Sequence, residues 1–161
     1  MPEIKDNLSV LFVCMGNICR SPTAEGVFRH YVSEAGLEHY IGVDSAGTHD
    51  YHVGAPPDRR ARAAAARRGF SLEDLRARVI GEEDFTRFDL ILAMDTDNLA
   101  LLKEQADVAH HEKIRLFLEY SSAKLTEVPD PYYGGQAGFE RVLDLVEDAS
   151  RGLLATLHKP A

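Results

Sequence analysis

Runs of β-branched and aromatic residues predict the strands of a parallel sheet. Residues 10–13 and 89–94 are almost unbroken apolar runs, and residues 40–47 and 113–118 are predicted to form two further strands. Continuous apolar runs are typical of strands that are covered on both faces, as in parallel sheets. The chain is therefore expected to place helices on both sides of its sheet.

Helical patterns separate these strands. Apolar residues recur at helical spacing behind Pro22, which predicts a helix from Ser21 to about Gly36 with Glu25 in its first turn. Further helices are predicted at 57–68, from Glu82, at 98–105 and at roughly 139–157. Alternating strands and helices indicate an α/β fold with right-handed crossovers. The length suits one domain, residues 1–161, with a polar and frayed stretch at 1–7.

Composition and charge narrow the classes of function. A net charge of −8 argues against nucleic acids and anionic membranes as partners. The sequence has no signal-peptide pattern and no apolar run long enough to span a bilayer, so a cytoplasmic protein is expected. Its only cysteines, Cys14 and Cys19, lie on one loop with neither zinc-site nor Cys-x-x-Cys spacing. We expect a monomer without cofactor, metal or disulfide framework. The arginines of the second helix are expected on a solvated face: Arg59, Arg60, Arg62, Arg67 and Arg68.

The loop between the first strand and the first helix concentrates the chemistry. The backbone N–H groups of residues 15–21 would point into one concavity at a helix N-terminus, which favours an anion of phosphate size. Gly16 supplies backbone freedom, and Asn17 tolerates left-handed torsions. Arg20 adds a planar fork of donors for two phosphoryl oxygens. The same surroundings favour the thiolate form of Cys14, which makes it a candidate nucleophile.

Four segments carry a resemblance to a known family. Cys14, five intervening residues, Arg20 and Ser21 form the signature of cysteine-dependent phosphatases, and the stretch resembles the low-molecular-weight protein tyrosine phosphatases. Residues 44–48 (Asp-Ser-Ala-Gly-Thr), 88–95 and 130–135 (Asp-Pro-Tyr-Tyr-Gly-Gly) match the same family in its order. The resemblance covers nearly the whole chain. It implies a sheet with strand order 2-1-3-4, with the Cys14 loop at the carboxyl edge where strand order reverses.

The resemblance also implies roles for individual residues. Cys14 would attack phosphotyrosine of protein substrates and form a cysteinyl-phosphate, while Asp130 would protonate the leaving phenolate. The phosphoryl group would be held by Arg20 and by the loop residues Met15, Gly16, Asn17, Ile18, Cys19 and Ser21. Loop support would come from Asn17, Ser21, Ser45 and Glu25, and the pocket wall from Tyr51, Tyr132 and Tyr133. Cys19 would trap a sulfenic acid on Cys14 as a reversible disulfide.

Other interpretations of single residues have to be weighed. Leu75 departs from the family, which often has a histidine near this position that supports the loop through the glutamate matching Glu25. Asp95-Thr-Asp97 after a strand is similar to the motif of haloacid dehalogenase-type phosphatases, but those enzymes carry it near the N-terminus. Asp97 is therefore interpreted as a helix cap or first-turn carboxylate. His110 and His111 suggest a metal pair, yet adjacent residues do not face one ligand, and an exposed pair is expected.

Three rival functions share parts of this pattern. Thioredoxin-coupled arsenate reductases need further cysteines, and none follows Cys19. Protein arginine phosphatases commonly have threonine at the position of Ile18, whose bulky apolar side chain favours an aryl group instead. A phosphotyrosine-binding module without turnover would have no need to keep Cys14, Arg20 and Asp130 together.

Overall fold

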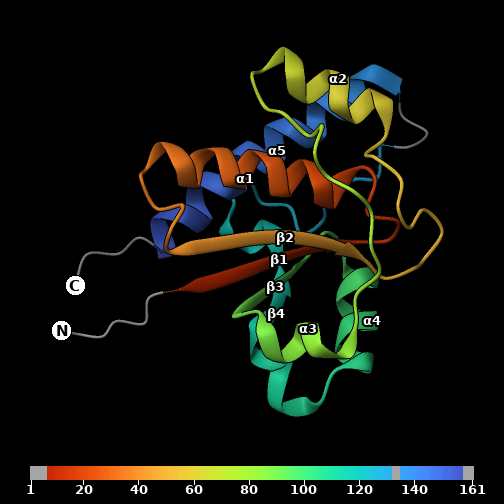
Figure 1. Ribbon diagram of the computed structural model, residues 1–161, viewed down its shortest axis with the longest axis vertical. Coiled ribbons are helices and arrows are strands. Elements are labelled where there is room, and N and C mark those ends of the chain that lie inside the picture. The colour runs from red at the N-terminus through yellow and green to blue at the C-terminus, as the bar shows by residue number, and fades with distance from the viewer. Residues whose placement is uncertain (1–6, 132–134, 158–161) are drawn as a thin grey trace.

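The computed structural model describes residues 7–131 and 135–157, and its helices and strands alternate along the chain (Figure 1). The strands are β1 (Leu8–Cys14), β2 (Ile41–Gly47), β3 (Leu90–Ala93) and β4 (Ile114–Leu116). The α-helices are α1 (Arg20–Glu34), α2 (Arg59–Arg67), α3 (Glu82–Arg87), α4 (Thr96–Gln105) and α5 (Gly135–Leu157), and two short 3-10 helices are η1 (Val108–Lys113) and η2 (Phe117–Tyr120).

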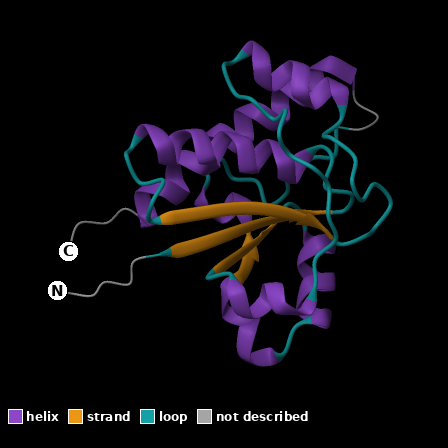
Figure 2. Ribbon diagram, viewed as in Figure 1, coloured by secondary structure: helices purple, strands orange, loops and turns teal. Residues whose placement is uncertain are grey.

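The four strands form one parallel sheet in the order β2-β1-β3-β4, as the sequence predicted. β1 lies in the interior of the sheet, where Val10 is paired with Val43 on one side and Leu90 on the other. Helices cover both faces: α1, α2 and α5 lie on one side and α3 and α4 on the other (Figure 2). The strand order reverses at β1, so the loop that follows Cys14 lies at the switch point of the sheet.

Alternate residues of β1 enter two separate cores. Phe12 belongs to the larger core, where its ring meets the rings of Phe28 at 5.8 Å and Phe117 at 4.9 Å, both edge to face. Leu11 and Val13 belong to the second core beneath α3 and α4. Both cores are needed to explain why residues 10–13 are apolar without interruption. None of the helices in the described ranges has the length and apolar character needed to cross a membrane.

Several boundaries differ from the sequence-based expectation. α1 begins at Arg20, so Glu25 lies in its second turn and not in the first. β4 is three residues long because the chain turns into η2 at Phe117. α5 begins at Gly135, which has φ of 69°, four residues before the predicted start. Asp97 lies in the first turn of α4, as one of the two alternatives proposed, but the cap of that helix is Asp95.

Two predictions about surface side chains were wrong. Arg68 is not part of a freely solvated face: its guanidinium pairs with three carboxylates of α5, namely Glu140 at 2.7 Å, Asp144 at 3.0 Å and Glu147 at 2.7 Å. His110 and His111 are half-buried, and a ring nitrogen of His111 lies 3.2 Å from the carbonyl oxygen of Ala106. Within 7–131 and 135–157, no three His, Cys, Asp or Glu side chains are grouped to hold a metal ion.

Candidate active site

Cys14 ends β1 and is buried, with 3% of its surface exposed. Its sulfur is approached by the backbone N–H of Asn17 at 3.3 Å and of Ser21 at 3.5 Å, and the Ser21 hydroxyl lies 3.0 Å from it. Hydrogen-bond donors that converge on sulfur stabilise a thiolate. Asn17 makes this geometry possible because it adopts φ of 60°, the left-handed conformation expected from its amide side chain.

The predicted support residues form one chain of hydrogen bonds below the loop. The Asn17 amide donates to Ser21 Oγ at 2.8 Å and to Ser45 Oγ at 3.0 Å, and Ser45 donates in turn to Glu25 Oε1 at 2.7 Å. The Asn17 carbonyl oxygen accepts from the backbone N–H of Arg78 at 2.9 Å. All four polar groups of this chain are buried. The Ser21 hydroxyl therefore accepts from Asn17 and has two acceptors for its own hydrogen, the Cys14 sulfur at 3.0 Å and the Ala46 carbonyl oxygen at 3.4 Å.

Arg20 joins the loop to two later segments. Its Nη1 donates to Asp95 Oδ2 at 2.7 Å and to the carbonyl oxygen of Val128 at 3.1 Å. Burial alone would lower the pKa of Arg20, but the nearby charges of Cys14 and Asp95 raise it overall, so the guanidinium stays charged. Its Nε is buried and has no hydrogen-bond partner among the described residues. A tetrahedral anion above Cys14 would supply that partner.

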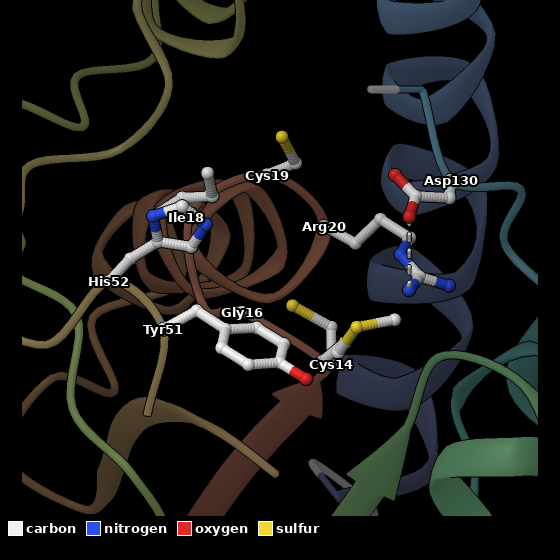
Figure 3. Close-up of a pocket in the computed structure, with 9 residues that line it drawn as sticks. Cys14, Gly16, Ile18, Cys19, Arg20, Tyr51, His52 and Asp130 are labelled. Carbon is white, nitrogen blue, oxygen red and sulfur yellow. Dashed lines mark ion pairs between the residues drawn. The ribbon is translucent and has the colours of Figure 1, made fainter. Parts of the chain in front are cut away.

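Asp130 reaches the same place from the far end of the chain. Its Oδ2 lies 3.9 Å from Arg20 Nη2, and its side chain is 46% exposed. The segment that carries it is fixed by the Val128 N–H, which donates to the Met94 carbonyl oxygen at 2.8 Å at the end of β3. In Figure 3 the Asp130 carboxyl and the Tyr51 ring lie on opposite sides of Cys14. The carboxyl is thus held at the mouth of the pocket and faces solvent as well as Arg20.

Cys14, Arg20 and Asp130 line one cavity of about 310 Å³, and the sulfur of Cys14 forms its floor (Figure 3). Apolar and aromatic side chains form much of its wall, which suits a substrate whose phosphate is attached to a ring. The lining residues are Cys14, Met15, Gly16, Ile18, Cys19, Arg20, Tyr51, His52 and Asp130. Tyr132 and Tyr133, also predicted for this wall, lie outside the described residues.

Burial changes the ionisation of two further groups. It raises the pKa of the Cys19 thiol, with a smaller contribution from the carboxylate of Asp58, so Cys19 stays protonated. Burial also raises the pKa of Glu25 to about 7, against the hydrogen bond from Ser45 that lowers it. Arg29, on the same helix, lies 3.6 Å from the other carboxyl oxygen of Glu25, Oε2. Leu75 is buried in the larger core and offers no polar group to this network.

Sequence reasoning missed three contributors to the site. Asp95 follows β3 at the carboxyl edge of the sheet, and this position could have identified it. The half-buried His52 follows Tyr51 on the pocket wall. Arg78 acts through its backbone N–H, which no side-chain pattern reveals. Its guanidinium pairs with Asp44 and Asp84 and so fixes the segment that carries this N–H.

Comparison with known proteins agrees with this geometry. A family model described as "Low molecular weight phosphotyrosine protein phosphatase" matches residues 9–161. The chain belongs to the low-molecular-weight protein tyrosine phosphatase family. A family member from Streptomyces coelicolor, named low molecular weight protein-tyrosine-phosphatase, is 46% identical over 93% of each chain. The Bacillus subtilis member YfkJ, of the same name, is 42% identical over 94% of this chain and 97% of its own.

Solved structures of the family share the architecture. A protein tyrosine phosphatase from Entamoeba histolytica, crystallised with Hepes in its active site, superimposes with a TM-score of 0.91. It is 41% identical, and the match covers 94% of this chain and 97% of that one. The predicted fold and family are therefore confirmed.

Proposed function

We propose that this protein hydrolyses phosphotyrosine in protein substrates, and aryl phosphates generally, through a cysteinyl-phosphate intermediate. One observation carries the proposal: the Cys14 sulfur, with donors from Asn17 and Ser21, lies on the floor of a cavity that Arg20 and Asp130 share. One phosphoryl group bound in this cavity could thus be attacked by Cys14, held by Arg20 and served by Asp130 as the acid.

The reaction needs two displacements at phosphorus. The Cys14 thiolate attacks in line while Arg20 and the loop amides hold the equatorial oxygens, and Asp130 gives its proton to the departing tyrosine oxygen. In the second step the Asp130 carboxylate takes a proton from water, which attacks the phosphoenzyme and releases inorganic phosphate. The Ser21 hydroxyl, 3.0 Å from the sulfur, donates a hydrogen bond that eases the departure of the thiolate.

Hydrolysis of p-nitrophenyl phosphate and of a phosphotyrosine peptide, both in excess chelator, tests the proposal. We expect metal-independent turnover in the wild type and its loss in Cys14→Ser. Activity that disappears with EDTA, or that survives in Cys14→Ser, contradicts it. Asp130→Asn should lower turnover most for leaving groups of high pKa, because these depend most on protonation. An equal reduction for all leaving groups would remove Asp130 as the acid.

The pocket wall favours a phosphorylated ring over a phosphorylated guanidinium. Ile18 and Tyr51 both line the cavity and present an apolar side chain and an aromatic ring to the substrate. We therefore expect kcat/KM for a phosphotyrosine peptide to exceed that for the same peptide with phosphoarginine. The reverse order would assign the protein to arginine dephosphorylation. Turnover of either peptide would distinguish a phosphatase from a module that only binds phosphotyrosine.

We also propose that Cys19 protects Cys14 from irreversible oxidation by forming a reversible disulfide with it. Peroxide would oxidise the Cys14 thiolate to a sulfenic acid with release of water, and the Cys19 thiol would condense with it to a disulfide and a second water. Both cysteines line the same cavity, and burial keeps Cys19 protonated by raising its pKa. We expect reductant to restore peroxide-treated wild type but not Cys19→Ser. Equal rescue of both contradicts this role.

The setting expected from the sequence completes the proposal. We propose a cytoplasmic monomer that acts on tyrosine-phosphorylated proteins without nucleic acid, membrane or metal partners. Light scattering of the purified chain tests the monomer, and cell fractionation tests the compartment.

A further inference from the structure

Glu25 is a buried acid that the proposed reaction does not use. It is 5% exposed on α1, yet a chain of four hydrogen bonds through Ser45, Asn17 and Ser21 connects it to the sulfur of Cys14. A carboxylate this deeply buried is stable only with compensating charge. The surrounding charges therefore decide in which form Glu25 exists.

The charged groups around Glu25 provide no surplus cation. On its own helix, Arg29 lies 3.6 Å from Glu25 Oε2 but also 3.5 Å from Asp74, and its side chain is 41% exposed. Asp44 on β2 and Asp74 both act on Glu25 as further negative charges. Arg78 is already shared by Asp44 and Asp84. Of these charged side chains, Arg29 alone favours the charged form of Glu25, in addition to the hydrogen bond from Ser45, and the Arg29 side chain is partly exposed to solvent.

The pocket on the other side of the network becomes more negative during binding. Arg20 is matched by Asp95 at 2.7 Å before any ligand arrives. A phosphoryl dianion adds two negative charges, which the loop amides and the N-terminus of α1 offset only partly. A charged Glu25, at the other end of the buried hydrogen-bond chain, would repel the dianion and weaken its binding, whereas a neutral Glu25 would not.

We propose that Glu25 is a charge-compensating proton acceptor beneath the phosphate loop: its protonated fraction rises when the pocket binds a tetrahedral dianion and falls when the anion leaves. The inference rests on the proposed function, because it requires the loop to hold such an anion. Burial raises the pKa of Glu25 to about 7, so the site can change protonation at neutral pH. By linkage, a proton on Glu25 and an anion in the pocket each strengthen the binding of the other.

The network can tolerate both forms of Glu25. Ser45 donates to Oε1, while Arg29 faces Oε2, so a proton on the carboxyl group leaves an oxygen that still accepts from Ser45. A glutamine at this position keeps the same acceptor and removes the titration. Glu25→Gln therefore keeps the size of the side chain and its acceptor oxygen, and removes only the ability to carry a charge.

The test uses inorganic sulfate, which stays a dianion throughout the neutral range. Cys14→Ser with Asp130→Asn removes the thiol and the carboxyl group that line the anion pocket, and Glu25→Gln is added to this background for comparison. The ¹³C carboxyl signal that disappears in the Glu25→Gln variant reports the protonation of Glu25. We expect its titration midpoint near 7 to rise by about half a pH unit with saturating sulfate, a threefold difference in affinity between the protonation states.

Sulfate affinity provides the reciprocal readout. Between pH 6 and 8 the dissociation constant should increase about 2.5-fold more with Glu25 than with glutamine at that position, most of the threefold difference expected over the full titration. Every other side chain of the pocket wall is common to both variants, so its effect on the affinity cancels in this ratio. A midpoint that sulfate does not move, or equal pH dependence of the two variants, overturns the inference while leaving the proposed function intact. Failure of sulfate to bind either variant contradicts the proposed anion site and the inference together.

Discussion

At the scale of single residues, Arg20 connects the loop to the rest of the site. Asp95 fixes one nitrogen of its guanidinium through a charge-assisted hydrogen bond of 2.7 Å, and the buried Nε is left for the ligand. In the proposed reaction, the orientation of Arg20 toward the phosphate would therefore depend on a carboxylate that is neither the nucleophile nor the acid. Asp95 also caps α4 by accepting from the Asn98 N–H at 2.7 Å.

Asp95→Asn tests this positioning role. Asparagine is as good a helix cap as aspartate, so α4 should remain intact while the ionic hold on Arg20 is lost. We expect kcat/KM for p-nitrophenyl phosphate to fall by about tenfold or more, equivalent to about 1.4 kcal/mol, within the range of a hydrogen bond to a charged group. Asp97→Asn, in the exposed first turn of the same helix, is the control and should change kcat/KM little. Equal kinetics for the two variants would show that Arg20 does not need Asp95.

Glu25 should also make folding stability depend on pH. Its pKa is raised from 4.5 in the unfolded chain to about 7 in the folded protein, so the folded state binds the extra proton between these values. Stability should therefore decrease as pH rises from about 4.5 to 7 and then level off. The loss attributable to Glu25 is at most about 3 kcal/mol, since one pKa unit corresponds to about 1.4 kcal/mol. Urea unfolding of wild type and Glu25→Gln across this range measures the difference, and parallel curves would contradict it.

The sequence identified the residues whose chemistry is visible in their type. Cys14 and Arg20 could be named from their residue types and the predicted loop, whereas Asp130 could be named only from the resemblance of residues 130–135 to the family. The structure places all three at one cavity. The hydrogen bond from the Arg78 backbone and the pairing of Asp95 with Arg20 could not be named. Both depend on contacts between segments more than 60 residues apart, which one sequence does not reveal.

At the scale of elements, close approach between helix α5 and η2 constrains one glycine. A Cβ on Gly152 would meet the backbone carbonyl of Tyr120, which cannot move like a flexible side chain. Gly138, near the start of the same helix, faces Pro131 at an ordinary contact distance of 3.6 Å. The two glycines therefore differ in the space beside them, although both lie in α5.

This pair makes a matched prediction about stability. Gly152→Ala should lower the free energy of unfolding by about 1–3 kcal/mol, because the clash outweighs the better helix propensity of alanine. Gly138→Ala should raise it by up to about 1 kcal/mol, since only the propensity changes. Thermal unfolding of both variants provides the measurement. Stabilisation by both substitutions would mean that α5 and η2 are not in backbone contact.

The elements themselves were predictable where one physical pattern dominated. The strand, loop and helix of residues 8–34 follow from an apolar run that both cores bury and from helical spacing behind Pro22. The end of β4 was missed because apolar residues continue from the strand into the following 3-10 helix, as Leu116, Phe117 and Leu118, so hydrophobicity does not mark the turn. Arg68 was misjudged because its partners, Glu140, Asp144 and Glu147, lie on one face of a distant helix.

At the scale of the whole molecule, overall charge and local charge oppose each other. The net charge of −8 repels a phosphorylated substrate at long range, whereas the phosphate loop and Arg20 attract it within the pocket. Salt screens the long-range repulsion over about 8 Å at physiological ionic strength, and it screens buried contacts much less. The balance of the two should be visible in the salt dependence of kcat/KM.

Two phosphotyrosine peptides that differ only in flanking charge test this balance. When ionic strength rises from about 10 mM to about 150 mM, kcat/KM should increase for the peptide with acidic flanks and decrease for the peptide with basic flanks. Both changes should be a few-fold. Salt effects of the same sign and size for the two peptides would show that the overall field does not influence the encounter.

The central claim is that the Cys14 sulfur carries the phosphoryl group between the two half-reactions. Rapid acid quench during turnover of a phosphotyrosine peptide, followed by mass spectrometry of proteolytic fragments, measures this intermediate directly. The account predicts one phosphoryl group on the fragment that contains Cys14 in the wild type and none in Cys14→Ser. Turnover without phosphate on that fragment, or phosphate on another residue, would contradict it.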